Sequence, residues 1–424
     1  MFSFSRVWKT KEVRNSLLFV FAMLVIFRIA AHIPVPGVDP SALVDYFNGN
    51  QFFGLLNIFS GGTLQHFSIV ALGLAPFITA SIIFQLLAMI FPKLEEMQKE
   101  EQGRQKINQW SRLLTVPLAL LQGYGLVLLF NQQSGAQLFT NGTADLMTTV
   151  LVMLSLTAGT VFLMWMGELI SEKNLGNGTS VLIFAGIIAG LPGYFSQSLA
   201  LYDRSQMITA IVFAVLVLVT IVAVVVMHEA QRNIPVQYAR QSTGSRLSGS
   251  VPSNLPIKLN IAGVIPIIFA ISIILFPRVI AQFLLNARTQ AVRDAAQWVL
   301  AAFQNQVLYG IVYFVLVFAF TYFYTSVIFH PDRVAENLQK QSGFIPGIRP
   351  GKPTADYIGW VTNRILLVGA AFLSIIAILP LVAQQVTGNT SLVIGGTSVL
   401  IVVNVVIETM KQMEAQMSMH EYEM

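Results

Sequence analysis

The chain has 424 residues, of which 55% are hydrophobic and only 11% are charged, and its mean hydropathy is +0.68. Ordinary soluble proteins have about 25% charged residues, so this composition cannot cover a water-exposed surface and predicts a membrane protein. The absence of cysteine excludes thiol catalysis, disulfides and cysteine-ligated metal centres. The net charge of +5 is modest, and the placement of the charges is more informative than their sum.

Apolar segments of about 20 residues, the length that crosses a bilayer core as a helix, recur along the whole chain. The sequence predicts ten transmembrane helices. They are residues 17–33, 69–91, 113–130, 147–169, 181–199, 208–227, 259–276, 307–329, 365–383 and 392–407. The first span follows a basic start, which also fits a cleaved secretory signal. Because Arg28 interrupts its apolar run and nine further spans follow, we expect an uncleaved helix.

The orientation of such a bundle follows from lysine and arginine, which are retained in cytoplasmic tips. With the N-terminus inside, the segments before span one and after each even-numbered span hold 20 of the 25 Lys and Arg residues. Both termini are therefore expected in the cytoplasm. The spans divide into halves of five, residues 17–199 and 208–411, flanked by a cytoplasmic segment 1–16 and a cytoplasmic tail 412–424. Because five is odd, halves that share a fold would form an inverted pair.

A short apolar segment lies between spans one and two. Residues 55–67 read LLNIFSGGTLQHF, which is too short to cross the membrane and is broken by Gly61-Gly62. Irregular backbone survives at membrane depth only when protein or an aqueous cavity surrounds it. This favours a short re-entrant helix that leads into span two, although a helix lying flat on the outer surface fits the same pattern.

Small and hydroxylated residues are frequent in spans two and seven, which contain GLAPFITASIIFQLL and NIAGVIPIIFAISIILF. Helices that meet through such residues pack closely but gain little over contact with lipid, so a seam between them could part at low cost. Pro76 and Pro266 permit kinks at similar depth. Ordinary bundle packing accounts for the same features.

Ionisable residues are nearly absent from the spans, where Arg28 and Glu168 are the exceptions. A proton- or sodium-coupled carrier would show more of them. The five histidines are dispersed, and no phosphate-binding loop or nucleophile motif occurs. The sequence therefore predicts no catalytic residue, cofactor or metal site. An intramembrane hydrolase lacks a nucleophile-base pair, whereas a secondary transporter of small solutes, built from inverted repeats, remains the alternative.

Two cytoplasmic loops are longer than a helix connection requires, residues 228–258 and 330–363. The first carries several arginines and almost no acid. The second contains GFIPGIRPGKP, in which three prolines and three glycines fix an exposed turn around Arg349 and Lys352. Such loops indicate docking surfaces for an acidic or nucleic-acid partner, and the alternative is a linker that carries topological charge.

Seven segments are similar, in this order, to signatures of one known family. They are FRIAAHIPVPGVD (27–39), NIFSGG (57–62), ALGLAPFITASIIFQLL (71–87), FLMWMGELISEKNLGNG (162–178), AGVIPIIFAISIILFP (262–277), GFIPGIRPG (343–351) and GGTSVLIVV (395–403). From about Val13 to Met410, the chain resembles the SecY family of bacterial protein-export channels.

The resemblance implies an all-α polytopic membrane protein, with ten transmembrane helices in two inverted five-helix halves around an hourglass pore and a short plug helix. The implied plug comprises Asn57, Ile58, Phe59, Ser60, Gly61, Gly62, Thr63 and Leu64. The implied constriction ring comprises Leu74, Ile78, Ile183, Ile268 and Ile401. All five ring residues are large aliphatics, which exclude water and ions from an empty pore.

The resemblance also implies a lateral gate between spans two and seven, flanked by spans three and eight. Its implied polar residues are Thr79, Gln122, Asn260 and Ser272. The implied docking residues for the SecA motor ATPase and for translating ribosomes, including ribosomal RNA, are Arg349, Arg240, Arg246 and Lys352. Further implied partners are the SecE and SecG subunits, unfolded secretory and membrane-protein clients, and the lipid bilayer. We therefore expect a passive protein-conducting channel of the cytoplasmic membrane, not an enzyme.

Overall fold

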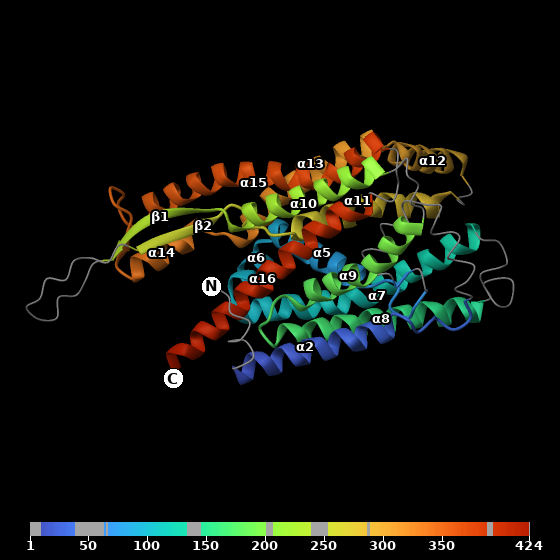
Figure 1. Ribbon diagram of the computed structural model, residues 1–424, viewed down its shortest axis with the longest axis horizontal. Helices are drawn as coiled ribbons and strands as arrows, with labels where there is room; N and C mark the ends of the chain where they lie inside the picture. Colours follow the sequence, from blue (N-terminus) through green and yellow to red (C-terminus); the bar gives the residue numbers. More distant parts are fainter. Residues whose placement is uncertain are drawn as a thin grey trace, which may run out of the picture.

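The computed structural model describes residues 10–38, 63–64, 67–133, 146–200, 207–238, 253–285, 289–387 and 393–423. The molecule is an elongated bundle whose helices run roughly along one axis (Figure 1). A small sheet protrudes at one end of the bundle. The first long helix begins, and the last one ends, toward this same end (Figure 1).

Each of the ten expected spans falls on one helix. The helices are α2 (Lys11–Ala30), α5 (Ala75–Ile90), α7 (Glu101–Gln133), α8 (Leu146–Ser171), α9 (Gly178–Ala200), α10 (Met207–Glu229), α11 (Ile265–Leu284), α13 (Gln306–Ile328), α15 (Lys352–Thr387) and α16 (Val393–Glu423). Within the described residues, five of them are individually long and apolar enough to cross a bilayer. Helices α5 and α6 (Pro92–Lys99), which are bent by 114° relative to each other, are long and apolar enough only when they are taken together.

The predicted kinks at Pro76 and Pro266 are wrong, because both prolines lie in the first turn of their helices. A proline is tolerated there since the N–H it lacks would have no helical partner. The chain before each helix is irregular, and Gly73 and Gly263 adopt φ angles of +57° and +66°. Spans two and seven therefore each consist of a non-helical entry followed by a helix.

The non-helical entry to α5 lies close against α8. A Cβ atom built on Gly159 of α8 would collide with the backbone carbonyl oxygen of Ile69. Val70, the next residue, is fully buried. Only glycine therefore lets α8 approach this backbone so closely.

The expectation of helices alone missed a small antiparallel sheet of order β2-β1-β3. It consists of β1 (Gln231–Tyr238), β2 (Ser253–Lys258) and β3 (Gly343–Phe344). Strand β1 pairs with β2 from Gln231 opposite Lys258 to Val236 opposite Ser253, and its other edge pairs with β3. Because β1 and β3 come from the two expected docking loops, the described parts of those loops form one folded unit.

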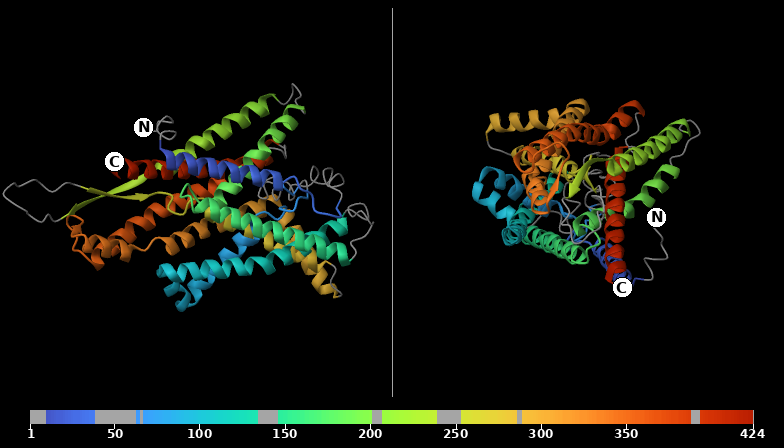
Figure 2. Two further views of the ribbon diagram at one scale, coloured as in Figure 1. Left: turned by 90° about the horizontal axis from the view of Figure 1, so that it is seen from below. Right: turned by 90° about the vertical axis from the view of Figure 1, so that its left-hand side faces the viewer.

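Two further helices complete the described structure. Helix α14 (Pro331–Lys340) packs between β3 and α15 at the sheet end of the bundle. Helix α12 (Gln290–Gln304) lies at the opposite end and runs across the direction of the spans (Figure 2). The membrane-crossing part of the chain thus lies between a folded sheet end and the α12 end.

Candidate functional site

The five expected ring residues meet in one apolar cluster. Leu74, Ile183, Ile268 and Ile401 are buried members of this cluster, and the half-buried Ile78 packs against them. They come from α5 and its entry, α9, α11 and α16, so both halves of the chain contribute. The structure therefore brings together side chains that are more than 300 residues apart in the sequence.

The residues around the five ring side chains are also apolar. Neighbouring buried members of the cluster include Val70, Leu163 and Val405, which are at most 3% exposed. Branched aliphatic side chains offer water no hydrogen bonds, and a narrow passage lined by them dewets. The arrangement can therefore form a dry collar that yields when a wider object displaces the side chains.

The end of the expected plug segment is fixed beside this cluster. Thr63 and Leu64 are at most 2% exposed, and the Thr63 hydroxyl donates a hydrogen bond of 3.1 Å to the carbonyl of Val70. The N–H of Val35 donates to the carbonyl of Phe67 at 2.9 Å, which ties the same segment to the chain that follows α2. Residues 57–62 of the expected plug lie outside the described residues.

The expected gate seam joins α5 and α7 to α11 and α13. A second apolar cluster, which we call the gate cluster, contains Ile82, Ala262, Phe269 and Tyr324, with Phe320 and others packed against it. The Phe269 ring meets the rings of Phe320 and Tyr324 edge to face, with centroids 6.1 and 5.6 Å apart. Both aromatic contacts join α11 to α13 within the second half of the chain, whereas α5 contributes the aliphatic Ile82 to the cluster from the other side of the seam. Lipid tails could replace apolar contacts of this kind.

Three of the four expected polar gate residues bond within their own segment. The hydroxyls of Thr79 and Ser272 donate to the carbonyls of Ala75 and Ile268, each at 2.9 Å. The buried Asn260 accepts a hydrogen bond of 3.0 Å from the N–H of Gly263. This bond supports the turn into α11. The expected clasp between Asn260 and Gln122 of α7 stays a prediction.

The turn between β3 and α15 presents the expected docking cations. Arg349 and Lys352 are exposed, whereas Gly347 and Gly351 adopt φ angles of +84° and +97°, a region that favours glycine. The Thr354 hydroxyl donates to the carbonyl of Arg349 at 2.9 Å. The turn is therefore held in one shape. Arg240 and Arg246, expected in the other loop, lie outside the described residues.

A shared apolar core supports the docking turn. Buried side chains from β1, β2, α14, the turn and α15 form one cluster. Its members are Ile234, Val236, Ile257, Leu338, Ile345, Ile358 and Val361. This core joins the described parts of both expected docking loops into a single projection. The sequence signal that could have revealed it is the alternation of apolar Ile234 and Val236 along β1.

The ionisable residues noted in the spans have simple surroundings. Glu168 of α8 forms an ion pair with Arg112 of α7, which joins two neighbouring helices. Arg28 lies in the last turn of α2, where the helix dipole favours a cation. In the described ranges, no group of three or more His, Asp or Glu side chains could hold a metal ion.

One hydrogen-bonded contact between the two halves could not be predicted from the sequence. The side-chain amide of Gln416, near the end of α16, donates to the carbonyls of Lys173 and Asn174 at 3.3 and 3.0 Å. These carbonyls belong to the turn between α8 and α9. The last helix of the second half thus contacts the first half near the sheet end. Every residue has a backbone carbonyl, so a bond from a side chain to such carbonyls cannot be predicted from the residue types.

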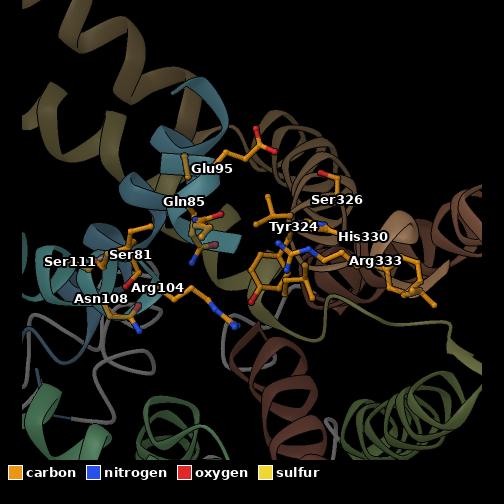
Figure 3. A pocket seen from close by; sticks show the side chains of 17 residues that line it. Ser81, Gln85, Glu95, Arg104, Asn108, Ser111, Tyr324, Ser326, His330 and Arg333 are labelled. Atoms are coloured by element: carbon orange, nitrogen blue, oxygen red, sulfur yellow. Dashed lines mark hydrogen bonds between the residues drawn. The ribbon is translucent and has the colours of Figure 1, made fainter. Parts of the chain in front are cut away.

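A cavity of about 630 Å³ lies beside the gate seam, between α5, α6 and α7 on one side and α13 and α14 on the other. Figure 3 shows Arg104 and Arg333 extending into it from opposite sides, with Tyr324 between them. Gln85 and Ser81 of α5 line the same space. The cavity therefore combines polar side chains with the apolar end of the gate cluster.

Comparison with known proteins identifies the family. A family model described as SecY matches residues 68–410. The protein translocase subunit SecY of Streptomyces coelicolor is 42% identical over 99% of this chain and 98% of its own length. Its counterpart from Staphylococcus aureus is 43% identical over 98% of this chain and 97% of its own length.

Solved structures share the fold. The structure of a protein-conducting channel superposes with a TM-score of 0.64 at 17% identity, covering 95% of this chain and 92% of that chain. Sec61 in the canine ribosome-channel complex gives a TM-score of 0.61 at 16% identity over the same shares. These likenesses confirm the expected fold class, an all-α polytopic membrane protein. The translocase relatives, which are 42–43% identical over nearly the whole chain, do not favour a small-solute transporter. Given the family match and the identity along nearly its full length, the chain belongs to the SecY family.

Proposed function

We propose that this chain is the central channel subunit of a protein translocase. It passes unfolded polypeptides across the cytoplasmic membrane and releases hydrophobic segments sideways into the bilayer. The meeting of Leu74, Ile78, Ile183, Ile268 and Ile401 in one apolar cluster is the observation that carries the proposal. The collar that they form seals the pore to ions at rest and opens around a passing chain. The segment 57–64 acts as the plug on its outer side, which the burial of its end at Thr63 and Leu64 supports.

Lateral release follows from the chemistry of the gate cluster. When the seam between α5 and α11 parts, a client segment in the pore can exchange its surroundings for lipid. A central Leu or Ile gains a few tenths of a kcal/mol in the bilayer, whereas a Lys or Asp costs about 2.5–3.5 kcal/mol. Partition of the segment therefore decides between insertion and export, and no chemical step by this chain is required.

In this proposal, partner proteins supply the energy for transport and hold the two halves of the chain together. The folded projection around Arg349 and Lys352 suits docking of the SecA motor and of a translating ribosome, with contacts to ribosomal RNA, because its exposed cations stand on a fixed turn. Two of the structural neighbours are channels seen in ribosome complexes. SecE and SecG are the proposed partner subunits. Because these partners act from the cytoplasm, the proposed orientation has the sheet end and both termini on the cytoplasmic side of the membrane.

Cross-linking the gate tests lateral opening directly, since the native chain has no cysteine. Ile82 of α5 and Phe269 of α11 belong to the gate cluster. In vesicles with the partner subunits and the motor, we expect a short bismaleimide to stop export in the Ile82→Cys/Phe269→Cys variant. The single variants, treated identically, should export at the untreated rate. Full export through a quantitatively cross-linked channel would refute gating at this seam.

A further inference from the structure

Helix α12 is joined to the gate helix α13 by a capped corner. Asn305 is the single residue between the two helices, and its backbone is extended, with a φ of −71° and a ψ of 108°. Its side-chain oxygen accepts hydrogen bonds from the N–H groups of Val307 and Leu308, at 3.0 and 3.3 Å. This cap fixes the corner at which the chain turns from α12, which runs across the spans, into α13 (Figure 2).

The position of this corner places α12 at the edge of the membrane. At about 1.5 Å per residue, the 23 residues of α13 span about 35 Å, enough to cross the roughly 30 Å of hydrocarbon core once. Val307 and Leu308, in its first turn, are 56% and 43% exposed. The lipid-facing surface of α13 therefore continues up to the corner, and α12 lies where the hydrocarbon core meets water.

The residues of α12 divide into three sectors, because successive residues of a helix are about 100° apart. The first sector faces the bundle. Ala296 is 2% exposed, and Phe303 packs against the core that α11, α13 and α15 share. The second sector is polar and exposed, and consists of Gln290, Arg293 and Gln297. This polar sector is suited to contact with water.

The third sector is apolar although it faces away from the bundle. It consists of Ala291, Ala295 and Trp298, and Asp294 lies at its border with the polar sector. Trp298 is 73% exposed. Tryptophan gathers at membrane–water interfaces, because its ring is apolar and its N–H group can bond to headgroups. A helix with separate polar and apolar exposed sectors is typical of one that lies in such an interface.

We propose that α12 is an interfacial helix at the membrane surface opposite the sheet end, with its Trp298 sector in contact with lipid and its polar sector in water. Bilayer lipid is the occupant, because the apolar sector continues the exposed apolar surfaces of α11 and α13. Ile280 and Leu284, near the end of α11, are 41% and 40% exposed. The helix thereby holds the linked gate helices at one depth while leaving them free to slide in the membrane plane.

Fluorescent probes on single cysteines test this placement, since the native chain has no cysteine. Ala295→Cys and Gln297→Cys both keep Trp298, and both positions are exposed, so neither change should disturb the fold. Each complex, assembled with cysteine-free partner subunits, is labelled with NBD in phosphatidylcholine vesicles. We expect nitroxide-labelled lipid to quench the probe of Ala295→Cys severalfold more than that of Gln297→Cys. Aqueous iodide should give the reverse order.

A second pair of variants tests the role of the indole ring. Adding Trp298→Ser to Ala295→Cys should lower the quenching by lipid about twofold, because the helix loses its interfacial anchor. Trp165→Ser is the matched control, since it removes an indole that is 55% exposed on α8. It should leave the quenching of the Ala295→Cys probe unchanged.

Three results would overturn the proposal. Equal quenching of the Ala295→Cys and Gln297→Cys probes would show that one medium surrounds α12. Protection of the Ala295→Cys probe from both quenchers would show that a partner protein or a second copy covers the apolar sector. An equal loss of quenching in Trp298→Ser and Trp165→Ser would contradict anchoring by Trp298. Export is not measured here, so failure of this proposal is distinct from failure of the proposed function.

Discussion

Replacing Ile78 or Ile268 with glycine makes the resting channel leak ions. Both side chains belong to the apolar cluster at the proposed constriction, and Ile268 is only 8% exposed. Glycine removes four carbons from the collar, and a gap of that size admits water where the native side chains exclude it. Single-channel recording in planar bilayers should show a resting conductance well above that of the native complex.

The neighbouring Ile267 provides the control for this experiment. It is fully buried on the same helix but belongs to the core formed with Tyr313 and Val317. Ile267→Gly should destabilise the protein by a similar amount, about 3–5 kcal/mol, without raising the conductance. An unchanged conductance in the ring variants, or an equal leak in Ile267→Gly, would contradict the assignment of the ring.

Reversing the charge of Arg349 abolishes motor-driven export while leaving assembly intact. The side chain is exposed on a turn held by Gly347, Gly351 and the bond from Thr354, so its replacement should not disturb the fold. A like charge at a docking contact costs several kcal/mol, which corresponds to roughly a hundredfold loss or more. The measurement is the rate of SecA-driven export of an unfolded precursor into vesicles.

Lys340 provides a matched charge reversal near the same projection. It is exposed at the end of α14, where it pairs with Glu336 four residues earlier at 2.8 Å, outside the turn. Lys340→Glu should lower export by much less than Arg349→Glu. Comparable rates for Arg349→Glu and the native channel would rule out docking through this turn.

The apolar pattern was sufficient to locate ten helices, because long hydrophobic runs have few alternatives to a buried or lipid-facing helix. It could not place the helix starts. At Pro76 and Pro266 the chain uses proline to begin a helix after an irregular entry, and hydropathy does not distinguish that entry from a kinked span. The sheet was missed because β1 and β2 lie in polar loops with only a few inward side chains, such as Ile234 and Val236.

The ring could not have been identified from composition or periodicity. Ile183, Ile268 and Ile401 occur among many similar aliphatics, and any of them suits ordinary packing equally well. Only the family resemblance singled them out, and the structure then placed them in one cluster. The cavity and the Gln416 contact depend on segments far apart in sequence, so no local pattern could have indicated them.

Cross-linking a stalled secretory chain inside the channel tests the conducting path most directly. Single cysteines at Ile78, Ile183 and Ile268 would be compared with cysteines at Leu113 and Val226, which are 69% and 62% exposed on the outside of the bundle. A single cysteine in the stalled chain should form disulfides with all three ring positions and with neither outer position. Cross-links at Leu113 or Val226 but none at the ring positions would show that the polypeptide does not pass through the apolar collar.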